Sequence, residues 1–177
     1  MITLTHTGLR VPPTHVHVTA TQRIGSGRDT IEIATVRQRR TLLGHTTNTH
    51  DGPTRFAAVD QRAAYVVWSF AMQTALFNPG LTEATVLDHL IAEHDWGLAV
   101  RDAGRRRCYL LWVIDASGLP AHAELLDIAA SYPDYPAAVR AARKRSFPTD
   151  AARAELWTGD VWTQIHPDQQ LTAEETS

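Results

Sequence analysis

The segment from Asp60 to Phe77 constrains the fold of this chain more than any other, because it is long, helix-forming and apolar on most of its circumference. At the helical repeat, its apolar residues fall into two stripes. The first stripe comprises Ala63, Val66, Val67, Phe70, Thr74 and Phe77, and the second comprises Tyr65, Trp68, Met72 and Leu76. A helix that is apolar on so many sides is typical of the centre of a domain, so the sequence predicts a core helix that ends at Asn78-Pro79-Gly80.

A β-hairpin is predicted before this helix, because residues 15–23 alternate strictly between two faces. The core face is expected to carry Val16, Val18 and Ala20, and the opposite face His15, His17, Thr19, Thr21 and Arg23. Gly25-Ser26-Gly27 is expected to form the turn, and the return strand is predicted over residues 30–43. The polar residues 44–53 are rich in turn formers and are predicted to be a loop.

The remaining chain predicts further helices and a second hairpin. One helix is expected from Thr82 to His94, followed by hairpin strands over 97–101 and 107–114. Three more helices are expected over 119–132, 137–145 and 150–157. Because hairpins and helices form separate blocks, we expect an α+β fold in which an antiparallel sheet built from two β-hairpins packs against the central apolar helix and further helices. We expect one domain over residues 1–165 and a polar, flexible tail over 166–177.

Composition limits the class of protein. The chain has 177 residues and a single cysteine, Cys108, which excludes an internal disulfide framework. It has no apolar run near the roughly 18 residues that a membrane span needs, and no cationic start followed by an apolar block. We therefore expect a soluble, cytoplasmic protein with no membrane partner.

Charge is distributed unevenly along the chain. Residues 1–58 carry seven arginines against three acidic residues, and residues 135–148 carry three arginines and one lysine with no acidic residue, so each block has a net charge of +4. Residues 59–134 and 149–177 each have a net charge of −5, and the whole chain has a net charge of −2. The small total charge therefore conceals two basic zones.

These zones, together with the tip of the second predicted hairpin, supply the candidate binding residues. A basic two-stranded ribbon can enter a DNA groove, and basic hairpin tips can contact phosphates. The candidates for binding a nucleic acid or another partner are Arg23, Arg28, Arg37, Arg39, Arg40, Arg105, Arg106, Arg107, Arg143 and Arg145. The alternative is a solvated rim of arginines paired with the acidic residues, within one chain or between two copies.

A second hypothesis starts from His15 and His17, which project from the same face of the predicted strand. Two imidazoles so placed can share a metal ion or a phosphate, as in metal-dependent nucleic-acid nickases, where Tyr65 would be the formal candidate for the nucleophile. Residues 17–20 also fit one strand of the two-histidine phosphoesterases, but no second copy of that motif is found.

No catalytic constellation in the sequence is complete. HExxH, Walker A and GxSxG motifs are absent, and no cofactor or metal is expected. We therefore expect an accessory or regulatory protein that binds a nucleic acid or a protein partner through its basic first hairpin. The alternatives are a phosphodiesterase or metal-dependent enzyme centred on His15 and His17, and a structural protein that self-associates as a homo-oligomer.

Overall fold

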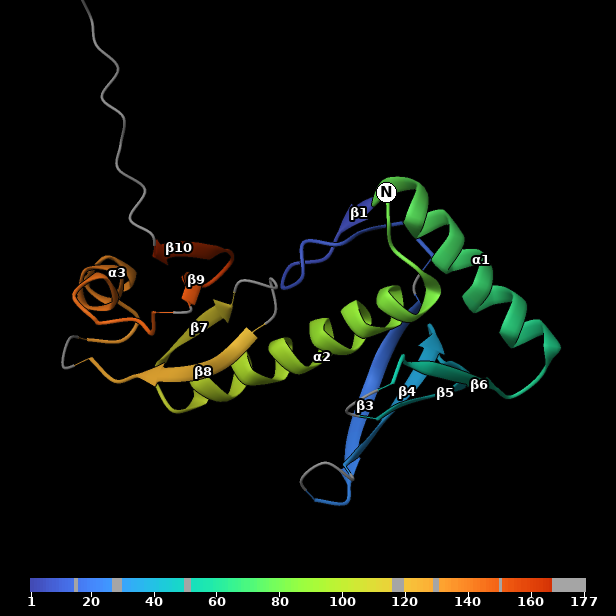
Figure 1. Ribbon diagram of the computed structural model, residues 1–177. Coiled ribbons are helices and arrows are strands. Elements are labelled where there is room, and N and C mark those ends of the chain that lie inside the picture. Colours follow the sequence, from blue (N-terminus) through green and yellow to red (C-terminus); the bar gives the residue numbers. More distant parts are fainter. Residues whose placement is uncertain are drawn as a thin grey trace, which may run out of the picture. The chain divides into compact units, whose positions relative to one another are not determined.

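A computed structural model of the chain describes residues 1–14, 16–26, 30–49, 52–115, 120–128, 131–149 and 151–166 (Figure 1). The chain divides into two compact units, Met1–Gly97 and Leu98–Ser177, and each is described by itself. Both combine helix with antiparallel sheet, so the predicted α+β class is confirmed. That residues 1–165 act as one domain stays a prediction, and the expected tail beyond His166 lies outside the described residues. No described helix is long and apolar enough to cross a membrane.

The first unit is built on a four-stranded antiparallel sheet with the strand order β3-β4-β5-β6. Its strands are β3 (Val16–Ile24), β4 (Ile31–Gln38), β5 (Thr41–Thr49) and β6 (Arg55–Ala58). A short ribbon of β1 (Ile2–Thr3) and β2 (Arg10–Val11) precedes the sheet, and α1 (Gln61–Phe77) and α2 (Glu83–Arg105) follow it. The first hairpin, the long helix from residue 61 and the helix that begins beside Thr82 are therefore confirmed.

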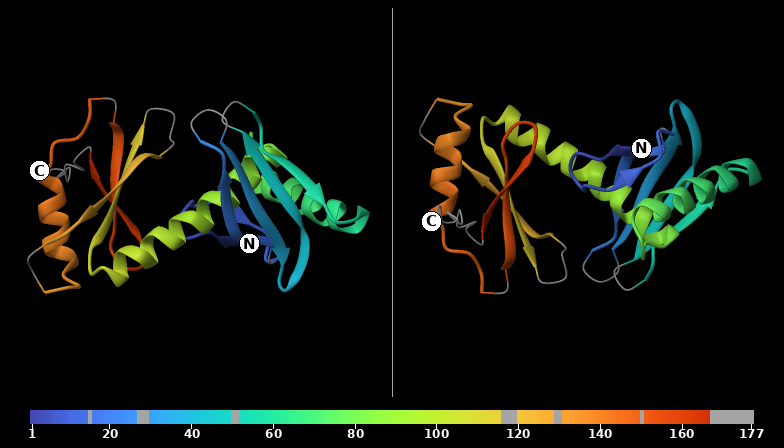
Figure 2. Two further views of the ribbon diagram at one scale, coloured as in Figure 1. Left: turned by 90° about the horizontal axis from the view of Figure 1, so that it is seen from below. Right: turned by 90° about the horizontal axis from the view of Figure 1, so that it is seen from above.

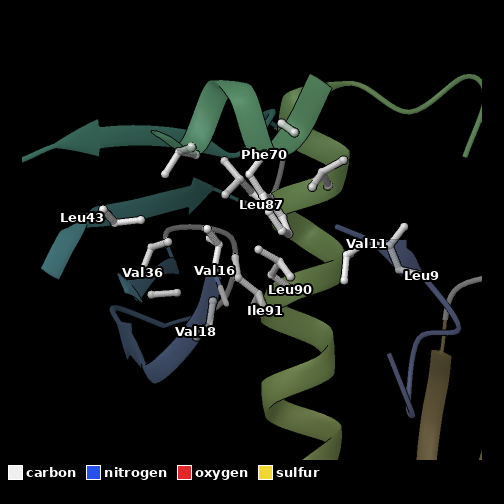
Figure 3. Packing of buried hydrophobic residues seen from close by; sticks show 14 of the residues in the cluster. Leu9, Val11, Val16, Val18, Val36, Leu43, Phe70, Leu87, Leu90 and Ile91 are labelled. Atoms are coloured by element: carbon white, nitrogen blue, oxygen red, sulfur yellow. The ribbon is translucent and has the colours of Figure 1, made fainter. Parts of the chain in front are cut away.

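Both helices contribute to a core on one side of this sheet (Figures 2 and 3). The core residues labelled in Figure 3 are Val16, Val18, Val36 and Leu43 from the sheet, Phe70 from α1, Leu87, Leu90 and Ile91 from α2, and Leu9 and Val11 from the N-terminal segment. Because α1 and α2 both lie on one face of the sheet, no described helix of this unit covers the other face.

Helix α1 is defined at both ends by side-chain hydrogen bonds. The Asp60 carboxylate accepts a hydrogen bond of 2.7 Å from the backbone amide of Ala63, an N-cap interaction. At the other end, the Asn78 side-chain amide donates to the carbonyl oxygens of Thr74 and Arg10, both at 2.7 Å. The second contact joins β2 to the end of α1, which positions the N-terminal segment against the core.

The prediction that α1 lies wholly in the core is wrong for one of its two stripes. Ala63, Val67, Phe70 and Thr74 of the first stripe are buried. The second stripe is exposed, with exposed fractions of 65% for Tyr65, 49% for Trp68, 47% for Met72 and 79% for Leu76. Helical periodicity identifies an apolar face but does not say whether the same chain covers it.

The second unit contains a four-stranded antiparallel sheet in the order β10-β9-β7-β8. Its strands are β7 (Tyr109–Asp115), β8 (Pro120–Leu126), β9 (Ala151–Trp157) and β10 (Trp162–His166). Helix α3 (Tyr135–Arg143) packs on this sheet through Ala138 and Ala142, against buried residues that include Leu111, Leu156 and Ile165. The prediction of a short basic helix in this region is confirmed.

Several predicted elements of the second half are wrong. Residues 97–101 belong to α2, and the predicted turn at 102–104 is also helical. Ala103 is buried, and Val100 is the single β-branched residue from 97 to 104, so the run has little of the preference for strand that such residues give. Residues 120–126 and 151–157 form strands β8 and β9, not helices. Both flank β7 in the sheet, so pairing with this apolar strand overrides the helical propensity of their alanines and glutamates.

The first half also contains one strand more than predicted. The expected return strand over 30–43 is interrupted by a two-residue turn at Arg39 and Arg40, which separates β4 from β5. Residues 44–49 continue β5, so the loop prediction is wrong there. Thr46 is fully buried between exposed His45 and Thr47, and this alternation in a polar segment is what a half-buried strand requires.

Candidate functional site

The helix-free face of the β3–β6 sheet is defined by its strand register. Ala20, Thr35, His45 and Ala57 lie in one cross-strand row, and Gln22, Ile33, Thr47 and Arg55 lie in another. A row at one end joins His17, Arg37 and Leu42, and a row at the other end joins Ile24, Ile31 and Thr49. We call this set the outer face: His17, Ala20, Gln22, Ile24, Ile31, Ile33, Thr35, Arg37, Leu42, His45, Thr47, Thr49, Arg55 and Ala57.

A β-bulge decides which side chains reach the outer face. The register of β3 against β4 shifts between Val18 and Ala20, so one extra residue reverses the alternation beyond that point. Ala20 is therefore exposed on the outer face, and Thr21 lies on the helix side, where its hydroxyl donates to Asp95 of α2 at 2.8 Å. The prediction that Ala20 faces the core and Thr21 and Arg23 face away from it is wrong for this reason.

The outer face carries positive charge without negative charge. Arg37 and Arg55 lie on it together with His17 and His45, and the Thr35 hydroxyl is 3.3 Å from Nδ1 of His45. Among the described residues of β3–β6, Glu32 is the single acidic residue, and it lies on the helix side. The face therefore combines cations, hydroxyl groups and an amide with the apolar side chains of Ile24, Ile31 and Ile33, and its polar groups suit phosphate and base edges.

The β4–β5 turn extends this cationic surface. Arg39 and Arg40 form the turn and are exposed, and Nη1 of Arg37 donates to the carbonyl oxygen of Arg40 at 3.0 Å. No described carboxylate forms an ion pair with Arg37, Arg39, Arg40 or Arg55. An open groove of about 490 Å³ beside the turn is lined by Pro13, Thr14, Gln38, Arg39 and Thr41.

The backbone of Arg39 is unusual for a residue with a side chain. Its φ angle is 53°, in the left-handed region that non-glycine residues seldom adopt. A turn of two residues between antiparallel strands favours positive φ, which is why glycine is usual there. An arginine held in this conformation places a guanidinium at the tip of the sheet at some cost in backbone energy.

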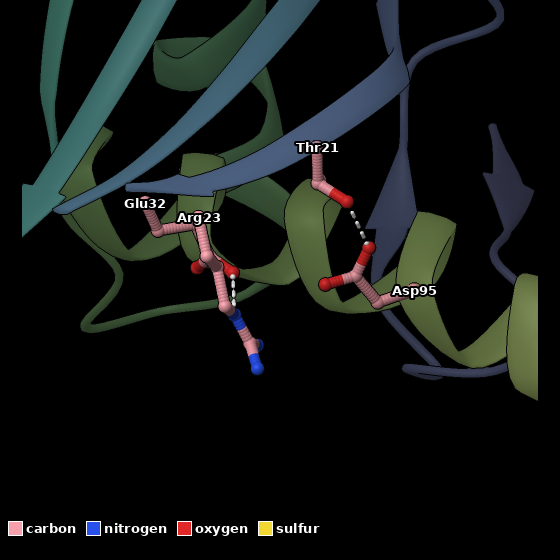
Figure 4. A network of polar contacts seen from close by, with 4 residues as sticks. All are labelled: Thr21, Arg23, Glu32 and Asp95. Atoms are coloured by element: carbon pink, nitrogen blue, oxygen red, sulfur yellow. Dashed lines mark hydrogen bonds and ion pairs between the residues drawn. The ribbon is translucent and has the colours of Figure 1, made fainter. Parts of the chain in front are cut away.

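Arg23, by contrast, does not belong to this surface. It lies on the helix side of the sheet, where its Nε is 3.0 Å from Oε1 of Glu32 (Figure 4). Thr21 and Asp95 form a hydrogen bond on the same side of the sheet. Two more residues proposed from the sequence, Arg28 and His15, lie outside the described residues.

The arginines at 105–107, predicted at a hairpin tip, instead end helix α2. The amide of Cys108 donates to the carbonyl of Ala103 at 2.9 Å, and the amide of Arg107 donates to that of Gly104 at 3.0 Å. These two bonds form a Schellman motif, and Arg107, with φ of 57°, occupies the position where glycine is usual. Arg106 also pairs with Asp102 at 2.9 Å. Cations here complement the helix dipole, so these side chains have a structural role.

The basic residues around α3 also lie at the C-terminal end of a helix or in an ion pair. Arg140 and Arg143 lie in its last turn, where they complement the dipole. Arg145 lies just beyond the helix and forms an ion pair with Glu124. These residues and Arg105–Arg107 belong to the second unit. The structure thus groups Arg37, Arg39 and Arg40, and it adds Arg55, His45 and Thr47, which the sequence analysis missed.

The histidine hypothesis gains no further ligand from the structure. Within the described residues, no group of three or more His, Cys, Asp or Glu side chains is placed to hold a metal ion. His17 lies on the outer face, and Tyr65 is exposed on α1, which packs against the opposite face of the sheet. The sheet therefore separates the two side chains that a nickase would need together.

The distance between Arg37 and Arg55 on the outer face is similar to the width of the major groove of DNA. Arg37 and Arg55 lie two strands and four residues apart, which places their Cα atoms about 16 Å from one another. The B-DNA major groove is about 12 Å wide, and it accepts a β-ribbon. Two extended guanidinium groups at this separation can therefore contact phosphates on both sides of one groove.

Comparison of the chain with family models, with curated proteins and with solved structures found no match.

Proposed function

We propose that this protein binds double-stranded DNA through the outer face of its β3–β6 sheet and the adjoining β4–β5 turn. The observation that carries the proposal is a sheet face with Arg37 and Arg55, flanked by Arg39 and Arg40, on which no described carboxylate balances the charge. We regard the role as accessory or regulatory rather than catalytic, and we place it in the cytoplasm.

The chemistry of the face favours backbone contacts supplemented by polar contacts to bases. Arginines neutralise phosphates and release counterions, which gives affinity that falls steeply with salt. The hydroxyl groups of Thr35, Thr47 and Thr49 and the amide of Gln22 lie on the same face as the cations and can donate to phosphates or base edges. Duplex DNA is favoured over duplex RNA because the A-form major groove is too narrow for a sheet.

The experiment measures fluorescence anisotropy of a labelled duplex of about 30 base pairs at salt concentrations from about 50 to 200 mM. One variant combines Arg37→Ala, Arg40→Ala and Arg55→Ala. The matched control combines Arg23→Ala, Arg106→Ala and Arg145→Ala, which removes the same charge from arginines that each pair with a carboxylate. Circular dichroism verifies that both variants fold.

The wild type and the control should bind with micromolar affinity at low salt. The first variant should lower the slope of log affinity against log salt by about 2 to 3, because each lost phosphate contact contributes about 0.9. Equal losses in both variants would mean that net charge alone governs binding. No binding by the wild type at micromolar concentration, or stronger binding to an RNA duplex of the same sequence, would overturn the proposal as stated.

A further inference from the structure

Helix α1 presents an apolar face that no described part of the first unit covers. Four large side chains, Tyr65, Trp68, Met72 and Leu76, are between 47% and 79% exposed. They lie on one helical stripe, opposite the stripe that packs into the core. The rings of Tyr65 and Trp68 are 5.8 Å apart and form one continuous aromatic surface.

The composition of this face is that of an interface core rather than a solvated surface. Arg62 is the single charged residue of α1, so nothing charged follows it over the roughly three turns that carry the stripe. The centres of protein interfaces are depleted in charge and enriched in Tyr, Trp and Met. A contiguous apolar patch of this kind on a soluble domain usually marks a binding surface.

We propose that α1 packs antiparallel against α1 of a second copy of this chain, forming a two-fold symmetric dimer. The spacing of the stripe favours this occupant. With a two-fold axis between residues 70 and 71, Tyr65 lies opposite Leu76 of the second copy, and Trp68 lies opposite Met72 of the second copy within one residue. Each aromatic ring thus meets an aliphatic or thioether side chain, and Met–aromatic contacts are favourable.

A cavity beside the stripe supports the same register. A cavity of about 140 Å³ is lined by Tyr65, Ser69 and Gln73 of α1 together with Thr14, Val16, Gln38 and other neighbours. Leu76 is the most exposed of the four apolar side chains. In the antiparallel arrangement, Leu76 of the second copy lies opposite Tyr65, so it is positioned to enter this cavity as a knob enters a hole.

Charge complementarity is provided by the helix ends. The Asp60 carboxylate caps the N-terminal end of α1, and the Arg10 guanidinium donates to the carbonyl oxygen of Phe77 at the C-terminal end. Antiparallel packing places the acidic end of each helix beside the basic end of the other, whereas a parallel pair would place like charges together.

The expected dimer is of moderate strength. At about 200 Å² for each large side chain, roughly half exposed, the stripe offers roughly 400 to 500 Å² of apolar surface per copy. A standard interface buries about 800 Å² per partner, so the neighbouring Gln61, Ala64, Ser69 and Gln73 must contribute as well. We therefore expect a dissociation constant in the micromolar range.

Sedimentation velocity across protein concentrations from about 1 to 200 μM tests the dimer. The variant Trp68→Gln/Leu76→Gln should raise the dissociation constant at least tenfold, and it should fold normally because both side chains are exposed. Val161→Gln is the matched control, because Val161 is 54% exposed and belongs to the second unit. A monomeric wild type over the whole range, or a dimer that the double variant leaves unchanged, would overturn the proposal.

Cross-linking tests the orientation. In a Cys108→Ser background, a short bismaleimide should link two copies of Met72→Cys, because residue 72 lies within about 5 Å of its counterpart along the helix axis. Two copies of Leu76→Cys lie about 16 Å apart along that axis and should remain unlinked. Linkage at both positions would indicate parallel packing and contradict the antiparallel dimer. The tested side chains lie on α1, away from the outer face, so failure here would leave the DNA-binding proposal untouched.

Discussion

Replacing Arg39 by glycine should stabilise the first unit and weaken DNA binding in the same variant. Arg39 has φ of 53°, and a side chain in this region costs about 1–2 kcal/mol relative to a right-handed conformation. Glycine removes this strain, but it also adds about 0.4–1 kcal/mol of conformational entropy to the unfolded chain. We therefore expect a net increase in the free energy of unfolding of about 0.5–1 kcal/mol.

Arg107 offers an internal comparison for the same substitution. Its φ is 57°, so glycine should relieve a similar strain. Arg107 also follows the last turn of α2, where a cation contributes about 0.3–1 kcal/mol through the helix dipole, and glycine would forfeit this. The change in stability for Arg107→Gly should therefore be close to zero, and its DNA affinity should match that of the wild type.

Urea denaturation followed by tryptophan fluorescence and by circular dichroism measures the stability of each variant, and the anisotropy assay measures its affinity. Arg39→Ala completes the set, because it removes the same charge but keeps a side chain at positive φ. It should bind DNA as weakly as Arg39→Gly and be less stable. If Arg39→Gly is no more stable than Arg39→Ala, the strain ascribed to this turn does not exist. If it binds DNA as tightly as the wild type, the turn is not part of the interface.

Two further substitutions test the fold around these sites. In Gly44→Ala, the new Cβ would clash with the carbonyl oxygen of Ala57, so β6 must move. We expect urea denaturation to show a loss of about 2–3 kcal/mol in the free energy of unfolding, and a loss below about 1 kcal/mol would contradict this packing. The pKa of Tyr132 is raised above its usual value near 10.0, mainly by burial and to a smaller extent by the neighbouring Tyr135 and Tyr109. The folded state therefore binds the phenol proton of Tyr132 more tightly than the unfolded state does. This difference adds to the free energy of unfolding below about pH 10, and the contribution is lost as the pH rises above that value. The free energy of unfolding should thus fall less steeply above about pH 10 in Tyr132→Phe than in the wild type, and identical slopes would refute the shift.

The elements that the sequence predicted correctly are those specified by local signals. Asp60 caps α1, the apolar run that follows propagates it, and Asn78 ends it, so a short window contains the necessary information. Strands β8 and β9 lack such signals, because their alanines, glutamates and leucines favour helix when considered alone. What makes them strands is pairing with β7, and that depends on residues far away in the sequence.

The candidate site was only partly predictable for a related reason. Arg37, Arg39 and Arg40 are adjacent in sequence, so their grouping needs no tertiary information. The inclusion of Arg55 depends on the pairing of β5 with β6, and the exclusion of Arg23 depends on a bulge that reverses the alternation of β3. The β-branched Thr46, Thr47 and Thr49 were the available sequence signal for β5, but the all-polar composition of the segment favoured a loop.

The contrast between the two left-handed arginines supports the proposed binding surface more specifically than net charge does. At Arg107 the fold itself uses the cation, because the side chain complements the end of α2 and the backbone completes a Schellman motif. At Arg39 the strained backbone ends a strand, where no helix dipole acts and no described carboxylate forms an ion pair with the guanidinium. The hairpin turn requires the positive φ but would accept glycine there, so the fold does not require an arginine at this position, and this supports a role for the side chain in binding outside the chain. Arg37, Arg40 and Arg55 likewise differ from the arginines that end helices or pair with acidic residues, because no described carboxylate forms an ion pair with them.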